Sequence, residues 1–154
     1  MSQEITTGYI LNVQRALEEL VNTYERCEQL CATLYGVTVA QGYALLTLPR
    51  DGTVTMNDLS QSIGLANSTM TRMVDQLIAR GLAIRDADPR DRRVVLVGLT
   101  GRGLEVRNSL EKTQEEFFQV VLADVGEQER RTILNTLQLV SDAVEKATEI
   151  CFSE

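Results

Sequence analysis

The apolar residues at the two ends of the chain are spaced for long amphipathic helices. They recur at alternating intervals of three and four residues, which places them on one stripe of a helix. The N-terminal stripe spans about seven turns and consists of Ile10, Val13, Leu17, Leu20, Tyr24, Cys27, Cys31 and Leu34. The C-terminal stripe consists of Ile133, Leu137, Val140, Val144, Ala147 and Cys151. A lone helix cannot bury such a stripe, so both predicted helices favour association.

Polar capping residues and glycines divide the middle of the chain into shorter helices. Thr38 and Gln41 form a capping box for a helix that ends before Pro49. Thr55 precedes a further helix, and Gly64 ends it. The short turn after Gly64 joins this helix to the next one, which is the spacing of a helix-turn-helix.

The helix that follows this turn combines a buried side with a polar first turn. We expect it to run over residues 67–80, with Met70, Met73, Val74, Leu77 and Ile78 facing inward. This leaves polar side chains near its start, namely Asn67, Ser68, Thr69, Thr71 and Arg72. Hydroxyl groups and a guanidinium at that place can meet base edges and phosphates in the major groove of DNA.

A β-hairpin with a basic tip is predicted after this helix. Gly81 ends the helix, and strands are expected over 82–86 and 93–99. The tip contains Arg90, Asp91, Arg92 and Arg93. Such a hairpin is typical of a wing, whose cations enter the minor groove or bind its phosphates. A polar helix start is often only a cap and a basic loop only a solvated turn, but their order and spacing together favour DNA binding.

Two more helices complete the predicted fold. Thr100 can cap a helix that extends to about Leu122, although Gly101 and Gly103 weaken its first turn. After a break at residues 124–126 the last helix begins. The fold class is therefore mainly α with a small β-hairpin wing, a winged helix-turn-helix flanked by long N- and C-terminal helices.

The acidic net charge of the chain is unusual for a protein that binds nucleic acid. The chain carries −7 at pH 7 with a pI near 4.7, the opposite of a typical DNA-binding balance. The charge is uneven, however, with eight arginines and six acidic residues from Thr55 to Arg107 against seven basic and sixteen acidic residues elsewhere. We therefore expect modest non-specific affinity and a strong dependence on salt.

Composition narrows the class of protein. The 154 residues suffice for one domain. Histidine is absent, which removes the commonest general base, and no enzyme is expected. Three cysteines are too few for a secreted disulfide scaffold, and neither a signal peptide nor a membrane span is evident, so a cytoplasmic protein with no membrane partner is expected.

The central sequence resembles the MarR-type winged-helix transcriptional regulators. The resemblance rests on LSQSIGLANSTMTRMVDQLIARGLAIR (59–85) and DPRDRRVVLVGLT (88–100). It implies a homodimer in which the first, fifth and sixth helices intertwine and hold two winged helices over a pseudo-palindromic site. It implies a DNA-binding region at 38–100 and dimerisation helices at 8–36 and 101–152 within a single domain, 1–154.

The resemblance also makes expectations for individual residues. It implies that Asp91 and Arg93 pair within the wing, with Arg90 or Arg92 nearer the minor groove. Ala66 stands where many relatives place a polar helix cap, and we expect Asn67 to take over that role.

The cysteines allow a sharper hypothesis. Cys27 and Cys31 are one helical turn apart on the apolar stripe, and Cys151 occupies the matching stripe of the last helix. If these helices pack together, the thiols converge without a nearby fixed carboxylate, and a thiol or soft-metal sensor results. The alternative is that each is a small buried hydrophobe. Arg26 is the only nearby cation that would favour a thiolate.

These features together predict a sequence-specific DNA-binding transcriptional regulator, an effector-released repressor that acts as a homodimer. Double-stranded DNA and a second copy of the chain are the expected partners. No cofactor is required, and a small molecule, an oxidant or a soft metal is the expected effector. One alternative is a thiol- or soft-metal-responsive regulator of the same fold that uses the three cysteines. A helical protein-protein adaptor would explain the acidic surface but not the wing.

Overall fold

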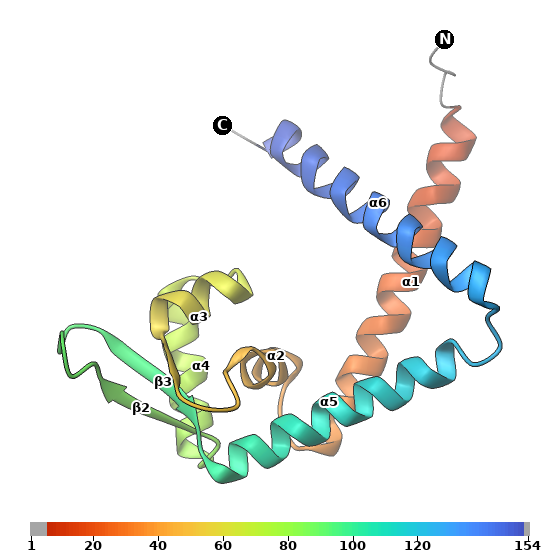
Figure 1. Ribbon diagram of the computed structural model, residues 1–154. Helices are drawn as coiled ribbons and strands as arrows, with labels where there is room; N and C mark the ends of the chain where they lie inside the picture. The colour runs from red at the N-terminus through yellow and green to blue at the C-terminus, as the bar shows by residue number, and fades with distance from the viewer. Residues whose placement is uncertain (1–5, 153–154) are drawn as a thin grey trace. The chain divides into compact units, whose positions relative to one another are not determined.

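The chain forms two units of packed residues, and the computed structural model describes residues 6–152 of it. The first unit is Met1–Gln114 and the second is Glu115–Glu154. The elements in chain order are α1 (Thr7–Leu34), α2 (Val39–Thr47), β1 (Thr53–Thr55), α3 (Met56–Ile63), α4 (Asn67–Ala79), β2 (Ala83–Ala87), β3 (Val95–Leu99), α5 (Gly101–Val121) and α6 (Glu127–Phe152) (Figure 1). This order confirms the predicted winged helix-turn-helix flanked by long helices.

Local sequence signals account for the ends of the central helices. Thr38 Oγ1 accepts a hydrogen bond from the Gln41 N–H at 3.2 Å, and Gln41 Oε1 accepts one from the Thr38 N–H at 3.1 Å. This is the predicted capping box. Gly64 ends α3 with φ 73°, and Gly81 follows α4 with φ 70°, a left-handed conformation that favours glycine.

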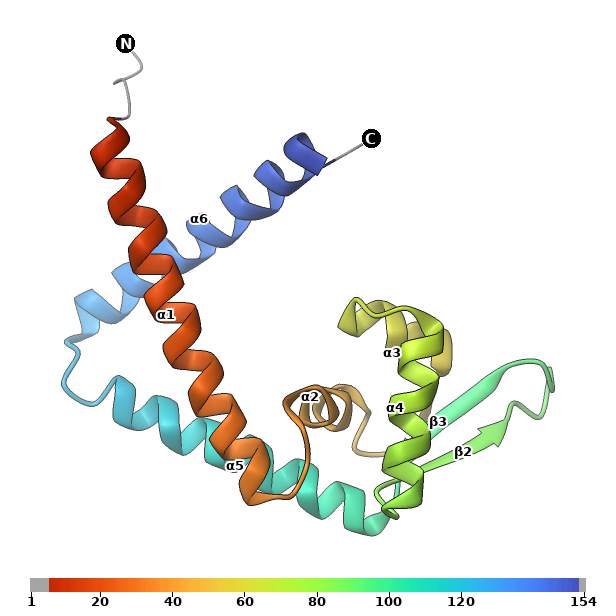
Figure 2. The ribbon, with the colours of Figure 1, turned by 180° about the vertical axis from the view of Figure 1, so that it is seen from behind.

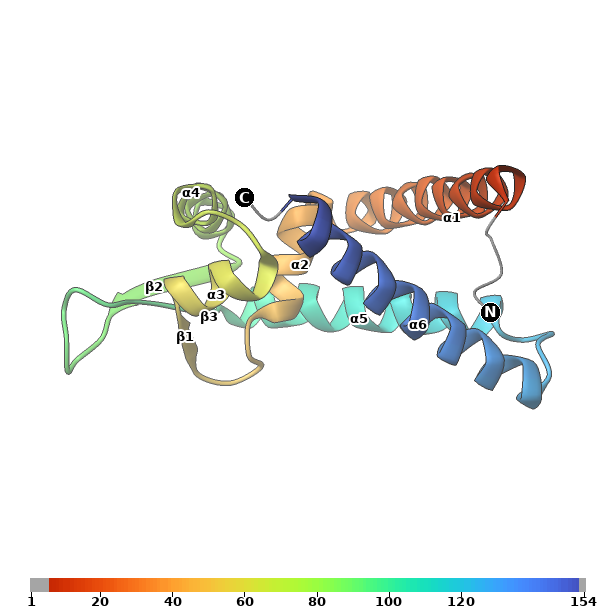
Figure 3. The same ribbon diagram turned by 90° about the horizontal axis from the view of Figure 1, so that it is seen from above.

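The three strands form one antiparallel sheet in the order β1-β3-β2, so β3 is central. In Figures 2 and 3 the β2–β3 hairpin extends past α3 and α4 as a wing. β3 begins at Val95, two residues later than predicted. Arg93 still belongs to the turn, because the next residue, Val94, donates its N–H to the Asp91 carbonyl oxygen at 2.9 Å.

A hydrophobic core holds the first unit together. Its largest fully buried side chains come from α2 and the residue that follows it, from α3, from α4 and from β3: Leu45, Leu48, Leu59, Met70, Val74, Leu77 and Val97. Burial of each such side chain stabilises the fold by about 1.5–3 kcal/mol. Leu110 of α5 is buried in the same cluster. The helix-turn-helix and the wing therefore share one hydrophobic core.

The start of α5 packs tightly against the base of the wing. Thr100 Oγ1 accepts a hydrogen bond from the Gly103 N–H at 2.9 Å and donates one to the Gly81 carbonyl at 2.6 Å. A Cβ at Gly103 would lie 1.8 Å from the Leu82 carbonyl oxygen. The glycine that we expected to weaken this helix is thus required by the close approach of the Leu82 backbone.

The long helix α1 leaves most of its surface in solvent. Ala32 is its buried residue, near the C-terminal end, where the helix joins the core. Ile10, Val13 and Leu20 of the predicted stripe are exposed. Only the last turns of α1 therefore use apolar contacts of the first unit.

Helix α6, in the second unit, is more exposed still. Val140 is half-buried, and the other described residues of this helix are exposed. Leu137 is 50% exposed and Val144 is 53% exposed. The predicted apolar stripe is present on the helix and stays open to solvent.

Within residues 6–152, no single helix combines the length and hydropathy of a membrane span. Only α1 and α2 taken together do so by length and composition, and they are bent by 76° at the break between them.

Candidate nucleic-acid interface

Helix α4 presents a polar first turn because its other face is fixed in the core. Met70, Val74 and Leu77 are fully buried. Ser68, Thr69 and Arg72 are exposed. Hydrogen-bonding groups on three neighbouring side chains are therefore available to a ligand that lies along the start of α4.

Asn67 does not take over the cap of α4. Ala66 is the N-cap of α4, and no side chain among the described residues caps this helix. The expectation that Asn67 replaces the cap is therefore wrong. Its Oδ1 accepts a hydrogen bond from Ser60 Oγ at 2.6 Å, and its Nδ2 donates to Asn57 Oδ1 at 3.3 Å. Because Ser60 is buried in α3, Asn67 holds the two helices of the helix-turn-helix together.

Thr71 is also partly committed within the protein. It is half-buried, and its hydroxyl donates to the Asn67 carbonyl oxygen at 2.8 Å. This leaves its oxygen only as an acceptor. Ser68, Thr69 and Arg72 thus differ from the other two predicted recognition residues, because Asn67 and Thr71 make hydrogen bonds within the protein.

The tip of the wing is shaped by two aspartates. Asp88 Oδ1 accepts the Arg90 N–H at 2.8 Å, and Asp91 Oδ1 accepts the Arg93 N–H at 3.0 Å. The pairing of Asp91 with Arg93 that the resemblance implies is thus made by the Arg93 backbone rather than by its guanidinium. The side chains of Arg90, Arg92 and Arg93 are all exposed. A fixed turn therefore carries three cationic side chains.

An ion pair joins the wing to the recognition helix. Arg85 Nη1 of β2 lies 2.8 Å from Asp75 Oδ1 of α4, and both side chains are about half exposed. A pair of this exposure contributes little to stability, typically about 0–1 kcal/mol. It does restrain the hairpin relative to α4. Sequence reasoning missed it because the residues belong to different elements.

The surroundings of Cys31 disfavour a reactive thiolate. Cys27 and Cys31 are half-buried, and Cys31 packs against the core. Burial and then the nearby Glu28 carboxylate raise the pKa of the Cys31 thiol. The expectation that no fixed carboxylate lies nearby is therefore wrong. Cys151 is exposed and belongs to the second unit, and residues 6–152 contain no group of three His, Cys, Asp or Glu side chains suited to a metal.

Glu28 also binds tyrosines at the junction of α1 and α2. Tyr43 Oη donates to Glu28 Oε1, and this hydrogen bond, together with burial, raises the pKa of Tyr43. Burial and Glu28 raise the pKa of Tyr24 in the same way. Phenols are ordinarily protonated at neutral pH, and the raised pKa of both tyrosines extends this to more alkaline pH, so both serve as hydrogen-bond donors to Glu28.

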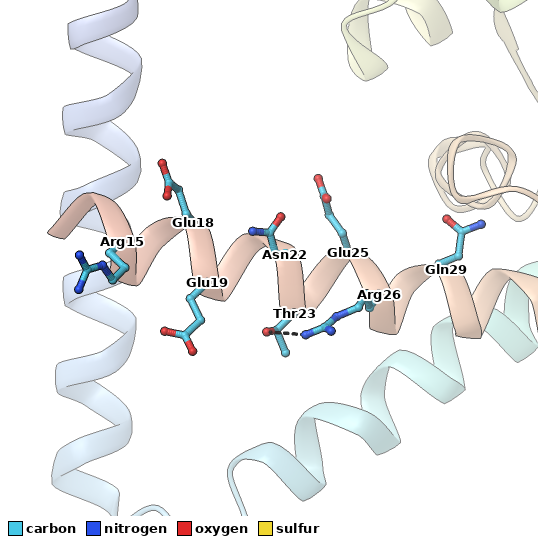
Figure 4. Close-up of a pocket in the computed structure, with 8 residues that line it drawn as sticks. All are labelled: Arg15, Glu18, Glu19, Asn22, Thr23, Glu25, Arg26 and Gln29. Atoms are coloured by element: carbon cyan, nitrogen blue, oxygen red, sulfur yellow. Dashed lines mark hydrogen bonds between the residues drawn. The ribbon is translucent and has the colours of Figure 1, made fainter. Parts of the chain in front are cut away.

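A shallow polar hollow runs along α1 (Figure 4). Its walls are Arg15, Glu18, Glu19, Asn22, Thr23, Glu25, Arg26 and Gln29, all from this one helix. Arg26 Nη2 donates to Thr23 Oγ1 at 3.4 Å, so the cation expected near the cysteines is bonded on the polar face. Small-molecule sites usually enclose most of the ligand surface, which one helix cannot do.

Known proteins share this arrangement. The model of the MarR family matches residues 37–95, from two residues before α2 into the wing. The HTH-type transcriptional regulator YdgJ of Bacillus subtilis (strain 168) is 30% identical over 102 residues, which cover 66% of this chain and 62% of YdgJ. The chain thus spans less than two thirds of the length of that relative.

Solved structures of low sequence identity have the same fold. FabT of Streptococcus pneumoniae, solved in complex with DNA, matches with a TM-score of 0.80 and 17% identity over 90% of this chain and 99% of FabT. The PcaV transcriptional regulator of Streptomyces coelicolor, solved with its natural ligand, matches with a TM-score of 0.63 and 26% identity over 81% of this chain and 91% of PcaV. Because the family model covers the helix-turn-helix and the matched relative is a regulator of this type, the chain belongs to the MarR family of HTH-type transcriptional regulators.

Proposed function

We propose that the chain is a sequence-specific DNA-binding regulator that acts as a homodimer on a pseudo-palindromic operator. The observation that carries the proposal is the pairing of an exposed polar helix start with an exposed arginine cluster on one rigid core. Ser68, Thr69 and Arg72 occupy the helix start. The FabT structure contains DNA, and this chain shares the FabT fold.

The start of α4 suits the major groove. Hydroxyl groups can pair with any base edge, and an arginine reads guanine through its O6 and N7 atoms. The first N–H groups of a helix lack partners within the helix, and Ala66 supplies none from a side chain. These N–H groups can bind a DNA phosphate at the rim of the groove. Arg72 is the side chain of this turn that we expect to carry most discrimination between bases.

The wing suits the adjacent minor groove or its phosphates. Arg90, Arg92 and Arg93 provide positive charge, and narrow minor grooves attract such side chains. Asp88 and Asp91 accept backbone N–H groups of the turn, so the loop is ordered before DNA arrives. Less conformational entropy is then lost on binding.

The exposed apolar stripes support a dimer. Ile10 and Leu20 of α1, with Leu137 and Val144 of α6, are exposed in one chain. A second copy provides the surface of matching chemistry, and two-fold symmetry would direct both α4 helices to one face of the duplex. Half-sites should then lie about 10 bp apart, centre to centre.

Genomic selection tests the proposal directly. Purified protein is mixed with sheared DNA of the source genome, bound fragments are sequenced, and the recovered fragment is compared with a shuffled duplex of equal length. We expect an inverted repeat and a tighter complex with the recovered fragment, with affinity that falls steeply as salt rises. Equal affinity for both duplexes at every salt concentration, or a footprint with one asymmetric half-site, would contradict it.

We further propose that the protein is a cytoplasmic repressor. An effector would release it from DNA. A small organic ligand is favoured over a reagent that modifies Cys31, because burial and Glu28 raise the pKa of that thiol and so lower its thiolate fraction. The PcaV structure holds a natural ligand in the same fold. By linkage, an effector that lowers operator affinity tenfold must itself bind the DNA complex tenfold more weakly. Titration of the complex with aromatic acids, oxidants and soft metals separates the effector classes.

A further inference from the structure

A hydrogen-bonded network joins the C-terminal end of α4 to α2. Gln41 of α2 is 5% exposed. Its Nε2 donates to Gln76 Oε1 at 3.0 Å, and its Oε1 accepts from Arg80 Nη1 at 3.2 Å. Gln76 lies in the last turn of α4, and Arg80 is the C-cap of that helix. One buried side chain therefore binds two residues of the helix that carries Arg72.

Arg80 extends the network to the end of α1. Its Nη2 donates to the carbonyl oxygen of Gly36, which follows α1 with φ 66°. A Cβ at Gly36 would lie 3.2 Å from that nitrogen, so the guanidinium packs directly against the glycine. The cation thus lies at the C-terminal ends of both α1 and α4, where the helix dipoles favour positive charge. α1, α2 and α4 meet at this one side chain.

We propose that Gln41, Gln76 and Arg80 are positioning residues that set the orientation of α4 for sequence-specific DNA binding. The inference rests on the proposed function, and these residues act through the exposed side chains of the first turn. Arg80, at the C-terminal end of α4, lies about 12 Å along the helix axis from Arg72. A rotation of the helix about its axis at one end therefore displaces Arg72 from its base contact at the other.

The apolar core by itself fixes this rotation less sharply. Hydrophobic burial is non-directional, whereas a hydrogen bond weakens steeply away from its preferred angle. Gln41 is buried, so loss of its partners would leave an unsatisfied polar group with a large desolvation cost. The network accordingly favours one rotation of α4 among those that the core permits. It also connects α4 to α1, the helix whose apolar stripe is open for a second copy of the chain.

The test separates specific from non-specific binding. Arg80→Lys keeps the charge but loses the two-pronged geometry, and Gln76→Leu removes the acceptor that Gln76→Glu retains. Arg102→Lys, at an exposed arginine at the start of α5, is the matched control. Affinity is measured for the selected genomic fragment and for a shuffled duplex of the same length over a range of salt. The unfolding midpoint of each variant is recorded alongside.

Arg80→Lys and Gln76→Leu should each bind the selected fragment about tenfold more weakly, within the range of coupling through packed networks. Their affinity for the shuffled duplex and their salt slope should stay at the wild-type values. Gln76→Glu and Arg102→Lys should keep the wild-type ratio of the two affinities. Equal loss on both duplexes with a smaller salt slope would make Arg80 a phosphate contact and overturn the proposal, as would an unchanged ratio in both variants.

A second measurement keeps this inference distinct from the proposed function. Wild-type protein that does not discriminate between the duplexes contradicts the proposed function itself. Amide hydrogen exchange in the DNA-free protein then decides the inference. Faster exchange in the last turn of α4 in Arg80→Lys, with the Arg102→Lys protein unchanged, supports the positioning role. Wild-type exchange rates in Arg80→Lys overturn it.

Discussion

Helices α4 and α6 use their apolar residues differently. Met70 and Leu77 of α4 are completely buried, whereas Leu137 and Val144 of α6 are about half exposed. Both helices carry a regular apolar stripe in the sequence. Isolated helices are marginal in water, so a helix depends on the surface against which its stripe packs. The stripe of α4 packs within its own chain, whereas that of α6 is available for a partner.

The elements that we propose contact DNA and the helices that we propose associate therefore draw their stability from separate sources. The core of the first unit positions α4 and the wing. In the proposed dimer, the terminal helices bring two such units together. In the proposed complex, DNA affinity is coupled to association, because one winged helix would supply only half of the contacts with a symmetric operator. Variants that affect only one of the two sources test whether the two are separate.

The largest effect is expected from a charge on the α6 stripe. Leu137→Glu should abolish both the dimer and operator binding, because the carboxylate would be buried without a partner at the interface. Gln138→Glu adds the same charge at the neighbouring exposed position and is the control. Sedimentation and gel shift measure the two effects. A Leu137→Glu dimer with wild-type operator affinity would contradict the role of the α6 stripe.

A substitution in the first unit should lower stability without acting through association. Gly103→Ala places a Cβ 1.8 Å from the Leu82 carbonyl oxygen and should lower the free energy of unfolding by about 3 kcal/mol. At Gly101 a Cβ would meet no described atom within 4 Å. Gly101→Ala should therefore leave that free energy unchanged or raise it by up to about 1 kcal/mol. Urea unfolding of both variants tests the close approach, and equal stability of the two would refute it.

The contacts of α4 and the wing should differ in kind. Arg72→Ala should weaken operator binding by about 1–3 kcal/mol with non-specific affinity retained, as expected for a base contact. Arg92→Ala should weaken binding to every duplex and lower the salt slope by about 1. Titrations at several salt concentrations distinguish the two. Full operator affinity in the double variant Arg72→Ala, Arg92→Ala would remove both assignments.

The smallest effect is expected at Cys31, where α1 joins the core. Its raised pKa means that less thiolate is present at pH 7 than in an unperturbed thiol, and that alkylation should accelerate only at higher pH. In the presence of a disulfide oxidant, the Cys31→Ser variant and the wild type should bind the operator with equal affinity. Alkylation rates against pH, with a short cysteine peptide as the reference, measure the first effect. Rapid modification of Cys31 at pH 7, together with release of DNA, would support the hypothesis that the cysteines form a thiol sensor.

The sequence predicted well those features that depend on neighbouring residues. Thr38 with Gln41 identified the start of α2, and the glycines at 64 and 81 identified the ends of α3 and α4, because caps require particular residue types at fixed spacing. The apolar periodicity identified the buried face of α4 for the same reason. The recognition and wing residues follow from these elements and stay predictions.

Contacts between distant elements left no such local signal. Asn67 was expected to cap its own helix, yet it binds Ser60 of α3. Gly103 was expected to weaken α5, yet the Leu82 backbone requires it. The bond from Arg80 to Gly36 spans 44 residues. Each of these depends on how the core brings two elements together, which the spacing along one element does not contain.

The missing cap at Ala66 places α4 on one side of a trade-off between stability and activity. A serine or aspartate there would strengthen the helix by about 1 kcal/mol. The added oxygen would accept N–H groups that we propose bind a DNA phosphate, and an aspartate would also repel that phosphate. The alanine keeps the recognition helix less stable than it could be and its first turn open. Thermostability screens of this protein should therefore recover Ala66→Asp among the variants that no longer bind the operator.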